Sequence, residues 1–210
     1  MSKVKKVPVP VLGRMPSYLS FVKTLQKMGE KYVSSTRIAE YMGIDSTQVT
    51  KDLSHTGLSG KTRVGYEVDS FVTVLEDFLG FNRLDNAFLV GAGSLGSALL
   101  QDQGLSAFGL KIEAAFDVDR AKIGTKVNGI EIFHIDELRT MAAEKNVVIG
   151  IITVPAENAQ NVADLMVAWG IKAIWNFTPA RIKAPSHIVV ENTTIYMNLA
   201  ILFNKLYNLE

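Results

Sequence analysis

The chain contains no cysteine in 210 residues, which excludes disulfides, thiolate metal sites and cysteine-based redox sensing. Only three histidines are present. No apolar run approaches the roughly 20 residues of a membrane span. Residues 1–14 carry basic side chains but no apolar stretch of signal-peptide length. These absences predict a soluble, cytoplasmic protein with no metal site.

The charged residues are distributed unevenly, although the net charge is only +1. Residues 1–66 contain eleven lysines and arginines and four acidic residues, a net charge of +7, whereas the remainder carries −6. A basic segment beside an acidic one is typical of a nucleic-acid-binding domain joined to a different domain. Chance clustering of charge is the alternative.

Three helices are predicted within residues 16–56. Pro16 suits the first position of a helix that ends at Gly29. A serine at position 34 or 35 begins a second, short helix, which Gly43 ends. Asp45 caps a third, with Gln48 as its capping-box partner. A short helix, a tight turn and another helix match helix-turn-helix spacing.

The third helix has one apolar face and one polar face. At 100° per residue, Val49 and Leu53 face inward, and Asp52 lies to the side. The outward face and its flanks carry short polar or basic side chains that can reach bases and phosphates in a major groove. These candidate DNA contacts are Thr47, Gln48, Thr50, Lys51, Ser54 and His55. A purely structural three-helix unit is the alternative.

Residues 57–68 predict a basic hairpin, with Lys61 and Arg63 near its tip and a strand over 64–68. A basic hairpin after a recognition helix is a wing, placed to contact the DNA backbone or minor groove. Another helix follows over 69–79. Residues 1–80 therefore predict a winged helix-turn-helix domain, and 81–85 a hinge.

Beyond Asn86 predicted strands alternate with helices, which indicates an α/β fold with a parallel sheet. Strands are predicted over 87–90, 112–116, 148–153, 173–176 and 188–190. Helices are predicted over 95–103, 136–144, 156–169 and 194–208.

The sequence GAGSLG at 91–96 has the spacing of a dinucleotide-binding loop. Gly91 permits a tight turn, Gly93 lets the backbone approach a pyrophosphate, and Gly96 lets the following helix pack on the strand. The second strand ends at Asp117, twenty-six residues after Gly91, where a carboxylate binds ribose hydroxyls and favours NAD over NADP. A glycine turn required only by packing is the alternative. The candidate cofactor residues here are Gly91, Ala92, Gly93, Ser94, Leu95, Gly96, Asp117 and Val118.

Two later strands end in proline-containing turns, ITVPA at 152–156 and NFTPA at 176–180. In an open parallel sheet such ends line the ligand crevice. Thr153, Val154, Pro155, Asn176 and Phe177 are therefore further cofactor candidates. Asn176 could bond a nicotinamide carboxamide, or it could serve only as a strand-end cap.

No catalytic residue is predicted. His55 ends the third helix, His134 lies in an edge segment, and His187 precedes the last strand. The predicted sheet occupies residues 86–190, which leaves no domain for a substrate. Cofactor binding without chemistry indicates a sensor rather than an enzyme.

Nearly the whole chain, residues 15–208, resembles the Rex family of redox-sensing transcriptional repressors. The resemblance rests on SS at 34–35, KDLS at 51–54, VGY at 64–66, GAGSLGSAL at 91–99, FDVD at 116–119, the block 153–180 and VEN at 190–192. It implies a homodimer that binds operator DNA, an AT-rich palindrome, when NADH is scarce and is released by NADH. It also implies that Ser35 contacts DNA and that the cofactor is NAD(H).

The chain departs from the family pattern at several positions. Thr50 replaces an arginine, His55-Thr56 replaces the aromatic pair of SYFG, and Thr62-Arg63 replaces Arg-Gly. Ser20 stands at a position that is commonly arginine, and Thr194 at one that is usually acidic. The first three changes lie in the predicted DNA contacts. The last two affect an ion pair that would couple the two domains.

The last segment, 193–210, predicts a helix that is apolar on nearly all sides. Such a helix must be buried, and the resemblance implies a dimerisation helix reaching into a second subunit. An internal core helix is the alternative. The predicted domains are thus a winged helix (1–80), a Rossmann-type NAD(H)-binding domain (81–192) and the dimer helix (193–210). The rival interpretation is a small NAD-dependent oxidoreductase or a CoA-binding protein with an incidental helical head.

Overall fold

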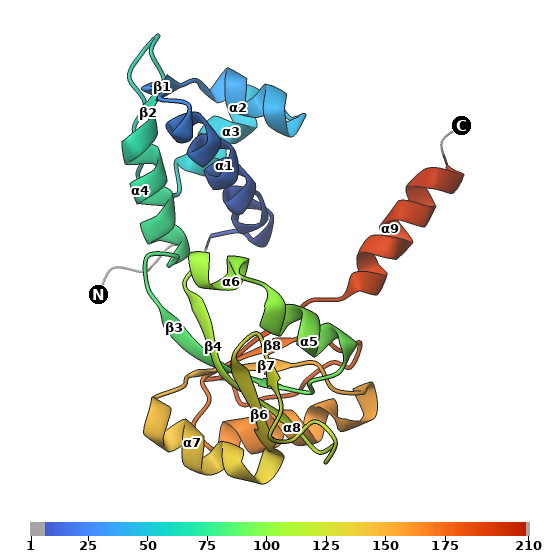
Figure 1. The fold of residues 1–210 in the computed structure, drawn as a ribbon. Coiled ribbons are helices and arrows are strands. Elements are labelled where there is room, and N and C mark those ends of the chain that lie inside the picture. Colours follow the sequence, from blue (N-terminus) through green and yellow to red (C-terminus); the bar gives the residue numbers. More distant parts are fainter. Residues whose placement is uncertain (1–6, 209–210) are drawn as a thin grey trace. The chain divides into compact units, whose positions relative to one another are not determined.

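The computed structural model describes residues 7–208, and the chain divides into two compact units between Arg83 and Leu84 (Figure 1). The first unit, up to Arg83, is the head, and the second, from Leu84 on, is the body. Lys3, Lys5 and Lys6 of the basic segment and the last two residues of the predicted C-terminal helix lie outside the described range.

The head is a small helical unit with a two-stranded ribbon. Its elements are α1 (Val9–Lys27), β1 (Tyr32–Val33), α2 (Ser35–Met42), α3 (Ser46–Leu53), β2 (Tyr66–Glu67) and α4 (Val68–Leu79). Ser34 caps α2 by accepting from the Arg37 backbone N–H, and Gly43 ends it with φ of 65°. Asp45 caps α3. These local signals were all predicted, and the result is a helix-turn-helix with a hairpin after α3.

The structure corrects the predicted start of the first helix. Helix α1 begins at Val9, with prolines at its first turn, so Pro16 lies inside the helix. Pro16 has no N–H, but the buried side of α1 outweighs that loss because it carries Met15, Tyr18, Leu19 and Val22, all fully buried. The preference of proline for the first helical turn holds for Pro8 and Pro10 at the start of α1, and not for Pro16.

The body contains a seven-stranded sheet in the order β5-β6-β4-β3-β7-β8-β9. The strands are β3 (Asp85–Val90), β4 (Leu110–Asp117), β5 (Lys126–Val127), β6 (Ile130–His134), β7 (Ile149–Ile152), β8 (Ala173–Asn176) and β9 (Val189–Asn192). All neighbours are parallel except β5 and β6. The six parallel strands follow the 3-2-1-4-5-6 order of a Rossmann fold, so the switch point lies between β3 and β7.

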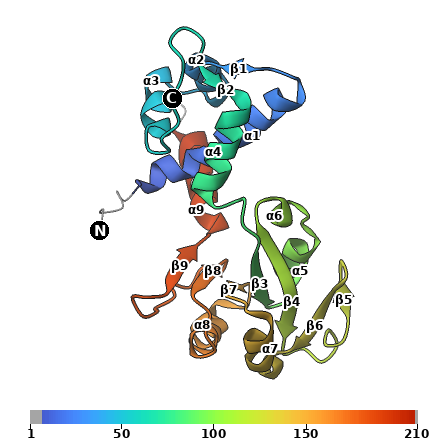
Figure 2. The same cartoon turned by 90° about the vertical axis from the view of Figure 1, so that its left-hand side faces the viewer.

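Helices cover both faces of the sheet (Figure 2). One core joins Phe88, Phe116 and Ile152 to α7 (Leu138–Lys145) and α8 (Ala159–Ala168). The other joins Ala87, Leu89 and Ile151 to α5 (Ser94–Gln101) and to the short α6 (Gly104–Ala107). A sheet covered on both faces explains why its strands read as continuous apolar runs.

Strands β5 and β6 were not predicted from the sequence. Their connection is a two-residue turn at Asn128-Gly129, with φ of 51° and 81°. Asn-Gly is the strongest short hairpin signal and could have revealed both strands. His134, assigned to an edge segment, instead ends β6, which lies between β5 and β4.

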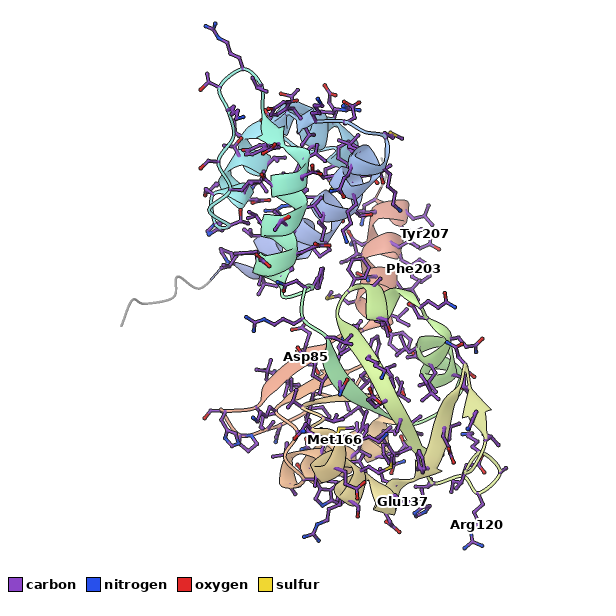
Figure 3. The ribbon with its side chains drawn as sticks, turned by 60° about the vertical axis from the view of Figure 1, so that its left-hand side comes forward. Asp85, Arg120, Glu137, Met166, Phe203 and Tyr207 are labelled. Atoms are coloured by element: carbon purple, nitrogen blue, oxygen red, sulfur yellow. The ribbon has the colours of Figure 1, made fainter. Side chains whose placement is uncertain are left out.

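Helix α9 (Ile195–Tyr207) follows β9 and has no buried residue. Its exposed apolar side chains include Tyr196, Leu202, Phe203 and Tyr207. Phe203 and Tyr207 project from the helix with ring centroids 6.1 Å apart (Figure 3). Within the described residues, no helix is long and apolar enough to cross a membrane.

Candidate functional site

The glycine loop between β3 and α5 is shaped by close backbone contacts. Gly91 has φ of 101°, and a Cβ there would lie 2.7 Å from the carbonyl oxygen of Thr153. A Cβ on Gly96 would overlap the carbonyl oxygen of Gly91. The hydroxyl of Thr153 donates to that same carbonyl oxygen at 2.8 Å. Gly91 and Gly96 are therefore required by the packing of the loop itself.

Gly93 differs from the other two glycines. A Cβ on Gly93 would meet nothing within 4 Å, and its φ of −78° suits any residue. Gly93 precedes α5, whose first backbone N–H groups receive no side-chain cap. Open space in front of uncapped N–H groups at the positive end of a helix dipole is what a pyrophosphate requires. The packing alternative explains Gly91 and Gly96 but not Gly93.

Asp117, at the carboxyl end of β4, is 9% exposed. Its carboxylate accepts hydrogen bonds from the backbone N–H groups of Ala92, Val118 and Asp119 and from the Lys122 ammonium, at 2.8–3.0 Å. Burial acts to raise the pKa of Asp117, but the bonds from Asp119, Lys122 and Ala92 prevail and lower it. The same contact raises the pKa of Lys122. The site thus holds a fixed carboxylate that is ionised at neutral pH.

Two cavities lie along this edge of the sheet, with volumes of about 490 and 280 Å³. Both are lined by Thr153, Val154 and Pro155 from the turn after β7. The larger also contains Gly91, Gly93, Asp117 and Val118 of the predicted set, and the smaller contains Leu95 and Phe177. A volume near 490 Å³ is within the usual range for ligand pockets. Most of the predicted cofactor residues therefore line one continuous edge.

Several residues that line the larger cavity were not among those predicted from the sequence. Lys122 and Ile135 come from the segments after β4 and β6, Asn158 directly precedes α8, and the others lie on α8. They are Lys122, Ile135, Asn158, Asn161, Val162 and Leu165. Ile135, Val162 and Leu165 give the larger cavity an apolar wall. The residue spacing in 153–165 does not reveal these lining residues, because only the packing of α8 against the sheet brings them to the cavity.

Asn176 does not line either cavity. It is fully buried, and its side-chain N–H groups donate to Ala180 O at 2.7 Å and to Asn192 Oδ1 at 2.9 Å. Its side-chain oxygen accepts from the Thr178 N–H. Asn176 is thus a strand-end cap, the alternative that the sequence left open. Ala92 is likewise buried and contributes its N–H to Asp117, while Ser94 is exposed at the start of α5.

Most of the residues predicted to contact DNA from α3 are exposed, but Gln48 has a partner that was not expected. Thr47, Thr50, Lys51 and Ser54 are exposed, and His55 is half-buried. Gln48 does not form a capping box. It instead donates to the Asp52 carboxylate at 2.7 Å.

Asp52 is fully buried rather than placed to the side. Arg14 of α1 donates to both of its oxygens at 2.6 and 2.8 Å, and the Tyr18 hydroxyl donates at 2.7 Å. Burial acts to raise the pKa of Asp52, but these donors prevail and lower it. Burial and the neighbouring carboxylate raise the pKa of Tyr18 to about 12. Asp52 therefore ties the third helix to the first.

A groove of about 590 Å³ runs between α3 and the hairpin. Its lining includes five predicted DNA contacts: Ser35, Thr50, Ser54, Lys61 and Arg63. Arg63 has φ of 65°, a left-handed conformation in a position where the family pattern has glycine. Lys61 lies 5.4 Å from the ring centre of Tyr32. The groove is basic and polar and suits a phosphate backbone.

The described residues hold no cluster of three or more histidine, aspartate or glutamate residues that could bind a metal ion. The two units together define a two-domain protein in which a winged helix precedes a Rossmann-type dinucleotide-binding domain.

Comparison with known proteins agrees with both halves. Residues 6–54 match a family described as putative DNA-binding protein N-terminus, and residues 82–180 match the CoA binding domain family. The redox-sensing transcriptional repressor Rex of Bacteroides fragilis is 58% identical over 201 residues, which cover 96% of this chain and 91% of that protein. The Rex repressor of Porphyromonas gingivalis is 52% identical over 204 residues, 97% and 94% of the two chains.

Solved structures give the same result. A crystal structure of RSP in complex with NAD+ and operator DNA has a TM-score of 0.89 and 30% identity, covering 97% of this chain and 94% of that one. RSP with NADH has a TM-score of 0.86 at 31% identity, covering 95% and 94%. RSP is a Rex-family repressor. The chain belongs to the Rex family of redox-sensing transcriptional repressors.

Proposed function

We propose that this chain is a transcriptional repressor that binds operator DNA when NADH is scarce and releases it when NADH binds. The observation that carries the proposal is the pairing of an open, uncapped helix N-terminus at Gly93 with the ionised Asp117 at one edge of the sheet. That pair suits the pyrophosphate and the ribose of NAD(H). RSP binds NAD+, NADH and operator DNA.

In this proposal the residues have separate tasks. The loop 91–96 binds the pyrophosphate, Asp117 binds the adenosine ribose, and the smaller cavity beside Phe177 takes the nicotinamide. Lys51, Lys61 and Arg63 neutralise DNA phosphates, while α3 enters the major groove. No catalytic residue is assigned, and the protein is not an enzyme.

The working unit is a homodimer built on α9. Nine large apolar side chains of this helix are exposed by 40% or more, and a second copy of the chain would bury them. The proposed domains are the winged helix (1–80), the NAD(H)-binding domain (81–192) and the dimer helix (193–210).

Reduced and oxidised cofactor would favour different arrangements of the dimer, because only a difference in affinity between two states can shift their populations. Rotation of the subunits would change the spacing of the two recognition helices.

Fluorescence anisotropy of full-length protein on AT-rich palindromic duplexes tests this function. We expect binding without cofactor, release by NADH, and weak or no release by NAD+. The same samples are followed at the NADH absorbance band to detect turnover. Absence of specific DNA binding at any salt concentration, together with NADH consumption on some substrate, would favour the oxidoreductase alternative.

A further inference from the structure

The recognition helix contains a side chain whose orientation is fixed from inside the head. Gln48 and Asp52 are four residues apart on α3 and lie on the same side of the helix. Gln48 is half-buried, and its Nε2 lies 2.7 Å from Oδ1 of Asp52. An ionised carboxylate only accepts hydrogen bonds. The nitrogen of the Gln48 amide must therefore face Asp52, and the amide oxygen must face away.

Asp52 is itself held by several donors. It is fully buried, and both oxygens are occupied: Arg14 donates to each, and Tyr18 donates to Oδ2. Arg14 and Tyr18 both come from α1. The Gln48 amide is thus bonded to a carboxylate that a second helix holds in place.

The oxygen of the Gln48 amide remains available. No described group donates to it, and no buried side-chain oxygen or nitrogen in the described residues lacks a partner. Its Oε1 must therefore be accessible to solvent. The NH₂ group also has a second hydrogen, because only one is used by Asp52. Gln48 thus offers one free acceptor and one further N–H donor on the same amide, and Asp52 fixes which end of the amide is which.

An acceptor beside a donor on a glutamine matches the N6 amino group and N7 of adenine in the major groove. We infer that Asp52 orients Gln48 so that Gln48 reads one adenine in each half-site of the DNA. Guanine presents two acceptors at these positions, so the fixed amide oxygen would face another oxygen. Gln48 contacts the base, and Asp52 is a positioning residue that acts through it.

This inference rests on the proposed DNA-binding function, but it can fail separately. The binding site is first selected from random duplexes with the full-length protein. Each adenine is then replaced by purine, which lacks the N6 amino group, or by 7-deazaadenine, which lacks N7. We expect each analogue to weaken DNA binding by about 2- to 10-fold at one adenine per half-site, because each removes a single hydrogen bond.

The variant Gln48→Ala should remove that sensitivity, so that the analogues bind as adenine does. Replacing the same adenine by another base should lower the DNA affinity of the wild type by about 5- to 150-fold. The affinity of Gln48→Ala should fall much less. Normal DNA binding with unchanged analogue sensitivity in Gln48→Ala would overturn the inference while leaving the proposed function standing. If the wild type binds no DNA at all, both this inference and the proposed function are overturned.

The positioning role is tested by two variants that alter the same carboxylate site. Asp52→Asn can present a donor to Gln48 and release its orientation, whereas Tyr18→Phe removes a bond to Asp52 without touching Gln48. We expect Asp52→Asn to lose adenine discrimination and Tyr18→Phe to keep it. Equal loss in both variants would show that Asp52 acts only through the fold of the head.

The wild-type protein gives a second measurement if Asp52→Asn does not fold. In ¹⁵N spectra of the free protein, the Gln48 side-chain amide should show one hydrogen that exchanges slowly and is shifted by the carboxylate. Side-chain amide signals at free-glutamine positions, with fast exchange, would exclude a fixed orientation.

Discussion

The variant Gly93→Ala tests the pyrophosphate site with the smallest possible change. A Cβ at this position would meet nothing within 4 Å, and its φ of −78° is ordinary for alanine. The free energy of unfolding of the cofactor-free protein should therefore change by less than about 1 kcal/mol, since alanine reduces unfolded-state entropy but is a poorer N-cap than glycine.

The effect on NADH should be much larger. The added methyl occupies the space through which phosphate oxygens approach the first N–H groups of α5. Loss of one charge-assisted hydrogen bond costs about 1.5–3 kcal/mol, which corresponds to roughly 10- to 150-fold weaker NADH binding. DNA binding by the cofactor-free protein should stay normal, and NADH should no longer release the DNA at concentrations that suffice for the wild type.

Two other glycines provide the matched controls. Gly96→Ala places a Cβ against the Gly91 carbonyl oxygen and should lower stability by about 1–3 kcal/mol. Gly13→Ala, in α1 of the head, also meets nothing within 4 Å and should leave NADH binding unchanged. Urea unfolding and NADH fluorescence titration measure the two effects. Wild-type NADH affinity in Gly93→Ala would show that the N-terminus of α5 is not the phosphate site.

Three further predictions concern single residues. Asp117→Asn should weaken NADH binding and lower stability at pH 7. Folding lowers the pKa of Asp117, so the stability that its carboxylate contributes is complete above about pH 3.9 and is lost as the pH falls through the folded-state pKa. The unfolding free energies of the wild type and Asp117→Asn, measured in urea, should therefore converge in acid. A difference that stays constant with pH would contradict this. Lys51→Ala should weaken DNA binding and reduce the salt slope by about one, while Lys172→Ala, an exposed lysine of the body, should change neither. Leu202→Asp on α9 should convert the dimer to a monomer in sedimentation experiments, and an unchanged dimer would place the interface elsewhere.

The sequence predicted those parts of the molecule whose causes are local. Ser34 and Asp45 cap their helices through N–H groups two or three residues away, and Gly43 ends a helix by its own φ. The glycine loop and Asp117 follow from fixed spacing within one βαβ unit. Strand–helix alternation gave the α/β fold. Strand β6 was missed although its Asn-Gly turn is a local signal, so that error was one of interpretation.

The tertiary structure decided which partners the polar side chains find. Asp52 was expected beside the DNA face, but Arg14 and Tyr18, more than thirty residues away in sequence, bury it. Asn176 was a candidate for the nicotinamide, but Ala180 and Asn192 use its amide.

The physical reason is that a buried polar group must satisfy its hydrogen bonds, and only the folded chain determines which donors are within reach. Helix periodicity and turn chemistry act over a few residues and can be read directly from the sequence. The lining of the cavity by α8, the ion pair of Asp117 with Lys122 and the network around Asp52 arise when distant elements pack together. The sequence by itself therefore determined the elements and the cofactor loop, and the packing of those elements decided which side chains remain free to meet a ligand.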